Sequence, residues 1–397
     1  MQAASAPHSP HFIDTQCPNC GGTGLESIYT QSGVPVHDVV LIESRSEALA
    51  FPRGDIRLGY CRHCGFATNT AFDDRAMHYD GRCEETQGAS STFNEYHRRL
   101  AGDLVQRYRL HGAHVVEIGC GKGEFLALLC RLGGNRGTGF DPAYVPGRID
   151  LARDMRVLAE NFTGRQDIAD AGLVCCKMTL EHIRQTREFL RALRRALPRD
   201  GIPVFFQVPD AERIYRARAF WDIYYEHCSY FTAPALAALF SGTGFDVEEI
   251  SWSYGGQYLT VFARSGGGAA PVDYEMSGIG RRVDAFRLEV SSTIARWRSV
   301  VTRVRRAGGR TVLWGGGSKA VAFLTALDPG PEVDFVVDIN QRKHGTYLPV
   351  TAHRVAPPTE LANRPPRLVI VMNRMYRREI QDRLAALGVA ARLLCLP

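Results

Sequence analysis

Residues 115–123 constrain the fold of this 397-residue chain more than any other segment. A short strand, Val115–Ile118, runs into three glycines spaced by one residue, which are Gly119, Gly121 and Gly123. A second strand, Gly137–Phe140, ends in Asp141. Glycines after one strand and an acid after the next are typical of a nucleoside-cofactor site in a doubly wound sheet. The acid is then expected to accept hydrogen bonds from the ribose hydroxyls.

The spacing of the glycines indicates which cofactor to expect. Dinucleotide-binding turns have the pattern G-x-G-x-x-G and hold a pyrophosphate at a helix N-terminus, whereas here the pattern is G-x-G-x-G. Glu124 opens the following helix, where it would repel a pyrophosphate. A cationic cofactor without phosphates fits better, and S-adenosylmethionine (SAM) is one. A glycine turn that serves only packing is the alternative.

Four of the eleven cysteines form two C-x-x-C pairs. The first pair is Cys17 and Cys20, and the second is Cys61 and Cys64. Each short turn can present two thiolates to one ion, and four thiolates complete the tetrahedral shell of zinc. We therefore predict a structural zinc ion and no zinc chemistry. A redox pair is the alternative, but two such pairs in a cytosolic chain favour a metal.

Composition and periodicity predict an α/β fold in three parts. Residues 1–16 are rich in Pro, Ser, Ala and His and are expected to be disordered. A zinc-binding module over residues 17–80 precedes a Rossmann-like cofactor domain over residues 81–265. A linker follows, and residues 272–397 form a smaller, Rossmann-like α/β domain. The alternation of strands and helices in the cofactor domain predicts a parallel sheet covered on both faces.

Individual elements follow from the same patterns. In the cofactor domain the expected strands are Val115–Ile118, Gly137–Phe140, Leu173–Cys176, Ile202–Val208 and Gln257–Ala263, and the expected helices are Phe93–Leu110, Glu124–Leu132 and Arg187–Leu197. From Ile279 to Val304 apolar residues recur every three or four positions, which predicts one long amphipathic helix. The strands expected after it are Thr311–Trp314, Val333–Val337 and Leu368–Val371.

The net charge of +6 is modest, and the arginines are scattered along the chain, so nucleic acid is not an expected partner. No apolar run is long enough to span a membrane, and the N-terminus lacks the apolar core of a signal peptide. We therefore expect a cytoplasmic location and no membrane partner.

Two segments carry side chains suited to proton transfer. Leu180-Glu181-His182 follows a strand at the sheet edge where ligands bind in open α/β folds. Further on, one short loop contains Tyr224, Glu226 and His227. A histidine beside a carboxylate can take a proton from carbon, and a tyrosine or second histidine can donate to the oxyanion that forms. An aromatic core loop with a buried, satisfied histidine is the alternative.

With these segments the chain resembles the three-domain SAM-dependent sugar C-methyltransferases of bacterial deoxysugar and polysaccharide pathways. The resemblance covers nearly the whole chain after about residue 14. Besides the four paired cysteines, the segments that carry it are residues 87–93, 117–123, 180–182, 224–231, 315–320, 337–349 and 373–380.

The resemblance implies methyl transfer from SAM to a carbon beside the ketone of a nucleotide-linked 4-keto-6-deoxysugar. It implies that His227 is the base and Glu226 orients it, while Tyr224 and His182 bind the sugar and the enolate oxygen. The cofactor contacts that it implies are Gln87, Ser91, Glu117, Gly119, Gly121, Gly123 and Asp141. Those implied for the nucleotide-sugar are Tyr79, Ser318 and Lys319. Family members often have a tyrosine in place of Cys83, so one substrate contact is either missing or supplied by Tyr79.

Two other functions use the same features. An O- or N-methyltransferase acting on a sugar or secondary metabolite would apply the same base to a hydroxyl or an amine. A zinc-containing RNA methyltransferase, with the cysteine pairs contacting RNA, is the more distant alternative. The modest charge and scattered arginines count against it.

Overall fold

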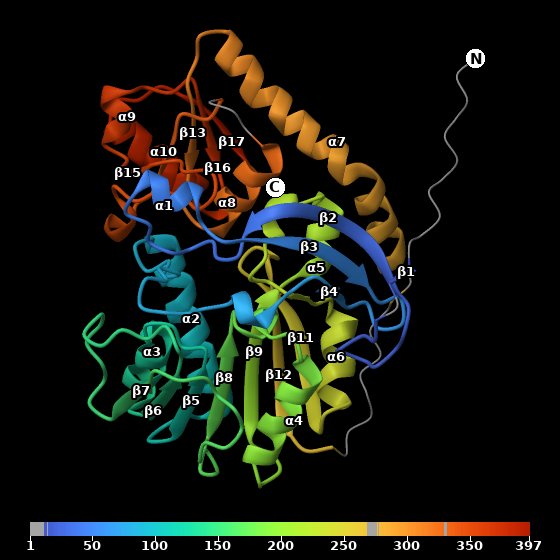
Figure 1. Cartoon of the computed structure of the whole chain (residues 1–397). Coiled ribbons are helices and arrows are strands. Elements are labelled where there is room, and N and C mark those ends of the chain that lie inside the picture. Colours follow the sequence, from blue (N-terminus) through green and yellow to red (C-terminus); the bar gives the residue numbers. More distant parts are fainter. Residues whose placement is uncertain (1–11, 14, 268–275, 277, 329–331) are drawn as a thin grey trace.

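The computed structural model describes residues 12–13, 15–267, 276, 278–328 and 332–397 (Figure 1). Within them the chain forms three β-sheets, and helices flank two of these. Figure 1 shows the seven-stranded sheet at one end of the molecule and the C-terminal domain at the other, with strands β2 and β3 between them. The predicted α/β fold class is confirmed.

The central sheet has the strand order β11-β12-β9-β8-β5-β6-β7. Its strands are β5 (His114–Ile118), β6 (Arg136–Phe140), β7 (Met155–Leu158), β8 (Leu173–Lys177), β9 (Pro203–Pro209), β11 (Phe245–Ser253) and β12 (Tyr258–Ser265). The five strands from β5 to β9 are parallel, but β12 is antiparallel to both of its neighbours. The prediction of a wholly parallel sheet is therefore wrong at this edge. A tight turn with positive φ at Tyr254, Gly255 and Gly256 joins β11 to β12, and such a turn can only connect antiparallel strands.

Helices cover both faces of this sheet. They are α2 (Ser91–Tyr108), α3 (Glu124–Gly133), α4 (Thr186–Ala196) and α6 (Ala233–Ser241), whereas α5 (Ala211–Ala217) packs into a separate core away from this sheet. Successive side chains of β5 enter opposite cores, because side chains alternate along a strand: Val115 packs with α2 and α3, and Val116 packs with α4 and α6. Helix α2 begins two residues before its predicted start because the Ser90 hydroxyl caps it by accepting from the Phe93 N–H.

The N-terminal sheet is antiparallel, with the order β1-β2-β3-β4-β10. Its strands are β1 (Phe12–Ile13), β2 (Leu25–Pro35), β3 (Arg53–Tyr60), β4 (Ala67–Asn69) and β10 (Ser229–Tyr230), and α1 (Arg45–Leu49) lies between β2 and β3. Part of the segment predicted to be disordered is therefore ordered at β1, while residues 1–11 and 14 lie outside the described part. Strand β10 begins two residues after His227, so this sheet holds one end of the loop predicted to be catalytic.

The C-terminal sheet is parallel, with the order β15-β14-β13-β16-β17. Its elements are α7 (Ile279–Arg306), β13 (Thr311–Trp314), α8 (Ser318–Leu327), β14 (Phe335–Val337), β15 (Val355–Ala356), α9 (Glu360–Asn363), β16 (Leu368–Val371), α10 (Arg377–Ala386) and β17 (Arg392–Cys395). Helix α7 confirms the long amphipathic helix that the recurring apolar residues from Ile279 to Val304 predicted. Most of the linker predicted before it lies outside the described residues. Among the described residues no helix is long and apolar enough to cross a bilayer.

One apolar core joins the three parts of the molecule. It contains Ile56 from β3, Trp221 from the loop before β10, Phe286 from α7 and Phe323 from α8. The rings of Phe323 and Phe220 are stacked, with centroids 5.7 Å apart. The loop that carries the predicted catalytic side chains is therefore fixed from three directions.

Candidate active site

A cavity of about 540 Å³ lies at the carboxyl ends of β5, β6 and β8, the edge of an open α/β sheet where ligands bind. Of the residues predicted to bind the cofactor, those that line it are Gln87, Glu117, Gly119, Gly121 and Asp141. Gly123 does not line the cavity; it forms the N-cap of α3, with a φ of 87°.

The glycine turn brings the backbone close to this cavity. Gly119 has a φ of 69°, and a Cβ there would lie 1.9 Å from Oγ1 of Thr179, so no other residue fits. The N–H of Gly121 donates to Oδ2 of Asp141 (2.8 Å), and the N–H of Ala143 donates to Oδ1 (2.8 Å). These bonds fix the carboxylate, while each oxygen keeps a second lone pair for a ribose hydroxyl.

Ser91 differs from its prediction, because it is an exposed residue at the start of α2 and does not line the cavity. Its neighbour Ser90 donates to Glu379 of α10 (2.8 Å). Ser90 thus contacts the C-terminal domain at the start of α2, and Ser91 beside it does not face the cofactor cavity. Gln87 is the predicted residue of this segment that lines the cavity.

Carboxylates outnumber lysines and arginines among the side chains that line this cavity. Glu117 is 1% exposed, and its Oε2 has no hydrogen-bond partner among the described residues. Burial raises the pKa of Glu117 to about 8, and burial also lowers the pKa of the neighbouring Lys177. Such a site favours a cationic ligand. SAM carries a sulfonium and an ammonium, so these residues fit the cofactor predicted from the glycine spacing.

Four of the predicted catalytic and substrate-binding side chains meet in this cavity from three segments. The Tyr79 hydroxyl lies 2.9 Å from Nδ1 of His182, the rings of His182 and His227 are 4.7 Å apart, and those of His227 and Tyr224 are 4.2 Å apart. Burial holds the pKa of the Tyr79 phenol well above its usual range, so this phenol stays protonated and is available to donate to Nδ1. When it donates, Nε2 of His182 is the nitrogen that carries the ring proton.

Glu226 lines the same cavity, but it does not pair with His227 as the sequence predicted. Its Oε1 accepts from Nδ1 of His37 (3.0 Å) and from the N–H of Asp38 (2.7 Å). Because the His78 N–H donates to Nε2 of His37, the proton of that ring resides on Nδ1. Glu226 lies in a turn with Tyr225, and its bonds to His37 and Asp38 direct its carboxylate away from His227.

The carboxylate that faces His227 belongs to Glu181, whose Oε1 lies 3.9 Å from Nε2 of the histidine. Both side chains are buried, at 1% and 6% exposure. Burial, with the nearby His182 and Lys319, holds the pKa of His227 well below its usual range. The histidine is therefore neutral in this site.

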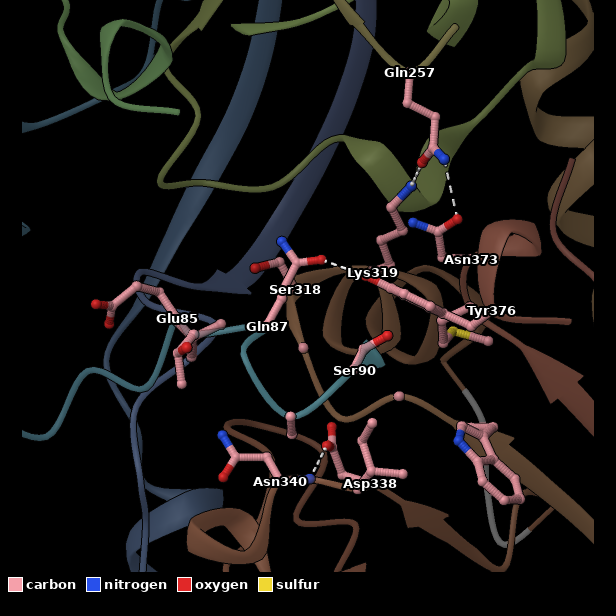
Figure 2. Close-up of a pocket in the computed structure, with 18 of the residues that line it drawn as sticks. Glu85, Gln87, Ser90, Gln257, Ser318, Lys319, Asp338, Asn340, Asn373 and Tyr376 are labelled. Atoms are coloured by element: carbon pink, nitrogen blue, oxygen red, sulfur yellow. Dashed lines mark hydrogen bonds between the residues drawn. The ribbon is translucent and has the colours of Figure 1, made fainter. Parts of the chain in front are cut away.

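A second cavity, of about 250 Å³, opens between the central and C-terminal domains. Figure 2 shows Gln87 and Ser90 facing Ser318, Lys319 and Tyr376 across it. The Tyr376 hydroxyl donates to Gln87 (2.7 Å). The two cavities share eight lining residues, which are Val39, Glu85, Thr86, Gln87, Met178, Tyr224, Tyr258 and Ser318. A ligand in one cavity therefore lies next to a ligand in the other.

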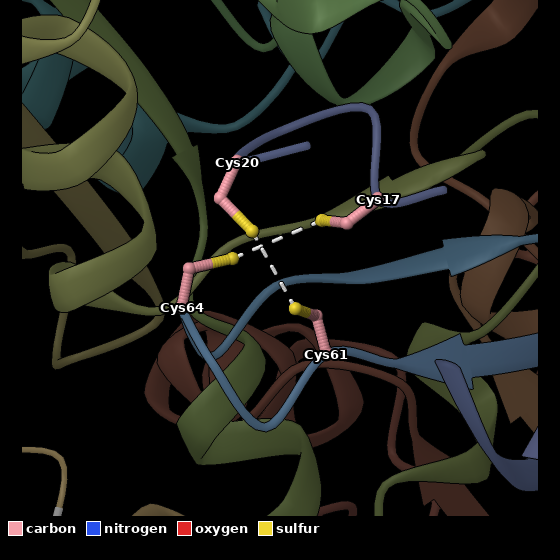
Figure 3. A group of neighbouring side chains, drawn as sticks. All are labelled: Cys17, Cys20, Cys61 and Cys64. Carbon is pink, nitrogen blue, oxygen red and sulfur yellow. Dashed lines mark hydrogen bonds between the residues drawn. The ribbon is translucent and has the colours of Figure 1, made fainter. Parts of the chain in front are cut away.

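The four predicted metal ligands converge (Figure 3). Sγ of Cys17 lies 3.8 Å from that of Cys64, and Sγ of Cys20 lies 3.6 Å from that of Cys61. Two sulfurs of a tetrahedral site with Zn–S bonds of about 2.3 Å are separated by about 3.8 Å. The Gly22 N–H and the Asn19 amide point at two of these sulfurs, as polar groups around bound thiolates do. The arrangement therefore fits a zinc site with four cysteine ligands.

Comparison with known proteins identifies the family. A methyltransferase-domain model matches residues 93–250, and a model of the C-methyltransferase C-terminal domain matches residues 279–393. The C-methyltransferase NovU of Streptomyces niveus is 28% identical over 313 residues, with 72% of this chain and 73% of NovU covered. Together these matches support a three-domain C-methyltransferase family for this chain. This C-methyltransferase is a SAM-dependent enzyme.

Solved methyltransferase structures match less than half of the chain, at low identity and low TM-score. One is the 1,6-didemethyltoxoflavin-N1-methyltransferase of Burkholderia thailandensis with S-adenosylhomocysteine, at 20% identity and a TM-score of 0.36, which covers 45% of this chain and 82% of that one. Another is a SAM-dependent methyltransferase of Aquifex aeolicus, at 13% identity and a TM-score of 0.33, which covers 42% and 89%.

The sequence analysis missed several residues of the cofactor cavity. Asn161 and Phe162 line it just after β7, a strand that its mixed Met-Arg-Val-Leu sequence did not reveal. Lys177 also lines it but was not singled out, and Glu181 was named only as part of the segment 180–182, without a role of its own. An ionisable residue at the end of an otherwise apolar strand, such as Lys177 after Leu173–Cys176, is a signal that would have found one of them.

Replacing Gly119 tests whether the glycine turn holds SAM. We expect Gly119→Ala to abolish measurable SAM binding, because its Cβ would displace Thr179 and the backbone has a left-handed conformation. Isothermal titration calorimetry measures this. The control is Gly102→Ala in α2, where a Cβ meets nothing within 4 Å, and this variant should bind SAM normally and gain about 0.5–1 kcal/mol of stability. Normal SAM binding by Gly119→Ala would contradict the cofactor placement.

Proposed function

We propose that this C-methyltransferase adds a methyl group to the carbon beside the ketone of a nucleotide-linked 4-keto-6-deoxysugar. One observation carries the proposal: a buried, neutral His227 lies beside hydroxyl and imidazole donors where the two cavities meet. A base and oxyanion donors are what the removal of a proton next to a ketone requires. The match to C-methyltransferase models favours carbon over oxygen or nitrogen as the acceptor.

The second cavity supports a nucleotide-linked substrate. Ser318 opens α8 after Gly315–Gly317, and no side chain caps this helix, so its first N–H groups are available to an anion. Lys319 lies beside them, paired with Asp222 at 2.8 Å. In this proposal the diphosphate lies at the N-terminus of α8, and the sugar extends past Tyr224 toward the cofactor cavity.

The chain's residues then carry out the proton chemistry. His227 removes the proton from the carbon beside the ketone. Nε2–H of His182 donates to the enolate oxygen, with Tyr79 holding the ring in that tautomer, and the Tyr224 hydroxyl donates from the other side. Glu226, fixed by His37 and Asp38, lines the sugar position. SAM, when bound, supplies the methyl group that the enolate carbon takes.

In the N-terminal module, the four cysteines bind one structural zinc ion in this proposal. The Asn19 amide donates to the carbonyl of Ala235 in α6 (3.0 Å), and Cys17 and Cys64 pack into the core that contains α6. Zinc then stabilises the junction between the first sheet and the central domain, since structural zinc contributes folding free energy directly.

Deuterium exchange tests the proposed reaction. The enzyme is incubated in deuterated water with TDP-, CDP- and GDP-linked 4-keto-6-deoxysugars, with and without SAM, and the products are analysed by mass spectrometry. We expect one sugar to gain a methyl group, and its exchange to slow by about 10²–10⁴-fold in His227→Asn, the range for loss of a general base. The exposed His111→Asn is the matched control and should behave as wild type. SAM binding without exchange or methylation on any sugar would reject the proposal.

The pH profile tests the protonation state of the base. A base acts only when unprotonated, and burial holds the pKa of His227 well below that of an ordinary histidine. Lowering the pH through about 6.5, where a free histidine takes up its proton, should therefore leave kcat/KM for exchange unchanged. A tenfold fall in kcat/KM per pH unit just below 6.5 would show that the base is an ordinary, solvated histidine.

Loss of a cysteine tests the zinc site. We expect Cys17→Ser to lower the zinc content from one ion per chain and to lower Tm by several degrees, because the junction with α6 loses its cross-link. Elemental analysis and calorimetry measure the two effects. Cys395→Ser, in β17 and outside the cluster, should keep both at the wild-type value. Metal-free wild-type protein with an unchanged Tm would reject the zinc assignment.

A further inference from the structure

Glu181 is a buried carboxylate that the reaction described above does not use. It lies in the 3-10 helix Leu180–His182, which follows β8 and borders the cofactor cavity. Its side chain is 1% exposed, and neither carboxylate oxygen has a hydrogen-bond partner among the described residues. A buried carboxylate without partners is costly, so its retention in this position requires a reason.

The neighbourhood of His227 supplies that reason. The base is neutral before the reaction and becomes an imidazolium when it takes the proton, and a buried cation needs a nearby anion. Its other titratable neighbours oppose this change, since His182 and Lys319 both disfavour the protonated ring. Glu226 is already bound to His37 and Asp38. Within the described part of the chain, Glu181 is the carboxylate that lies within 4 Å of the ring.

We propose that Glu181 is the positioning residue of the base: its carboxylate holds the Nε2–H of His227, leaves Nδ1 to take the proton from the sugar carbon, and stabilises the imidazolium that results. The proposal rests on the proposed function. It assigns to Glu181 the role that the sequence predicted for Glu226.

The geometry is suited to this role. The separation of 3.9 Å between Oε1 and Nε2 is too long for a hydrogen bond, and such contacts in substrate-free enzymes shorten when the substrate binds. In the described residues neither ring nitrogen of His227 has a hydrogen-bond partner, so no other group fixes its tautomer. Burial raises the pKa of Glu181 to about 8, and the nearby Lys177 offsets part of this rise. A positive charge on the adjacent His227 ring favours the charged carboxylate further. When the ring becomes cationic, attraction to the carboxylate keeps the shared proton on Nε2.

A double-mutant cycle tests the assignment. Deuterium exchange into the ketosugar is measured for wild type, Glu181→Gln, His227→Asn and the double variant, and SAM affinity is measured by calorimetry. We expect Glu181→Gln to slow exchange by about 10²–10³-fold and to change the SAM Kd by less than about threefold. In the His227→Asn background the same substitution should cause no further loss, because Glu181 acts only through His227. The exposed Glu188→Gln, a few residues along the chain, is the matched control.

Three results would overturn the proposal. Additive effects in the cycle would mean that Glu181 acts independently of His227. An unchanged exchange rate in Glu181→Gln would mean that the carboxylate has no part in proton removal. Exchange that a chelator abolishes and a divalent cation restores would mean that the carboxylate serves a metal instead of the base.

A substrate-free measurement separates failure of this inference from failure of the proposed function. Protein labelled with ¹⁵N-histidine reports the tautomer of His227, whose signals are those lost in His227→Asn. We expect Nε2 to carry the proton in wild type, and a shift toward the Nδ1–H tautomer in Glu181→Leu. If no ketosugar exchanges but the tautomer still depends on Glu181, the substrate assignment is wrong and the pairing stands. A tautomer that does not depend on Glu181 overturns the pairing, whatever the substrate.

Discussion

The pairing of β10 with β4 is the interaction on which the active site depends. Strand β10 contains only Ser229 and Tyr230, yet it joins the end of the catalytic loop to the N-terminal sheet. The Cys228 carbonyl accepts from the Asn69 N–H and the Thr68 hydroxyl (both 2.9 Å), which extends the pairing by one residue toward His227. The module that carries the four cysteines therefore positions the base, although it contributes few side chains to the cofactor cavity.

The same module also places the acidic side of the substrate site. His37 lies between β2 and β3 and holds Glu226 through a tautomer that the His78 backbone fixes. Tyr79 follows at once, and its hydroxyl forms a hydrogen bond with Nδ1 of His182. Two imidazoles are thus set by hydrogen bonds from the N-terminal part of the chain. The N-terminal part of the chain therefore orients proton-transfer groups that belong to the central domain.

Much of the fold followed from local sequence, and the errors have physical causes. The turn at Gly119 and the apolar stripe of α7 depend on residues close together in the chain, so they were predicted correctly. The antiparallel hairpin of β11 and β12 was missed because Gln257–Ala263 reads as a strand of either direction. Most of the side chains predicted for the site line the two cavities, but one predicted pairing differs from the structure. Sequence adjacency suggested Glu226 as the partner of His227, whereas the fold turns Glu226 to His37 and brings Glu181 from another segment.

The continuity of the two cavities has a thermodynamic consequence. Gln87, Tyr224 and Ser318 line both, and Gln87 also bonds to Tyr376 of the C-terminal domain. A ligand that orders these side chains in one cavity changes the free energy of filling the other. Such coupling is reciprocal: the factor by which SAM alters affinity for the second ligand equals the factor by which that ligand alters affinity for SAM. The shared wall makes the two binding events a single linked equilibrium, in which the order of addition has no effect on the final stability of the ternary complex.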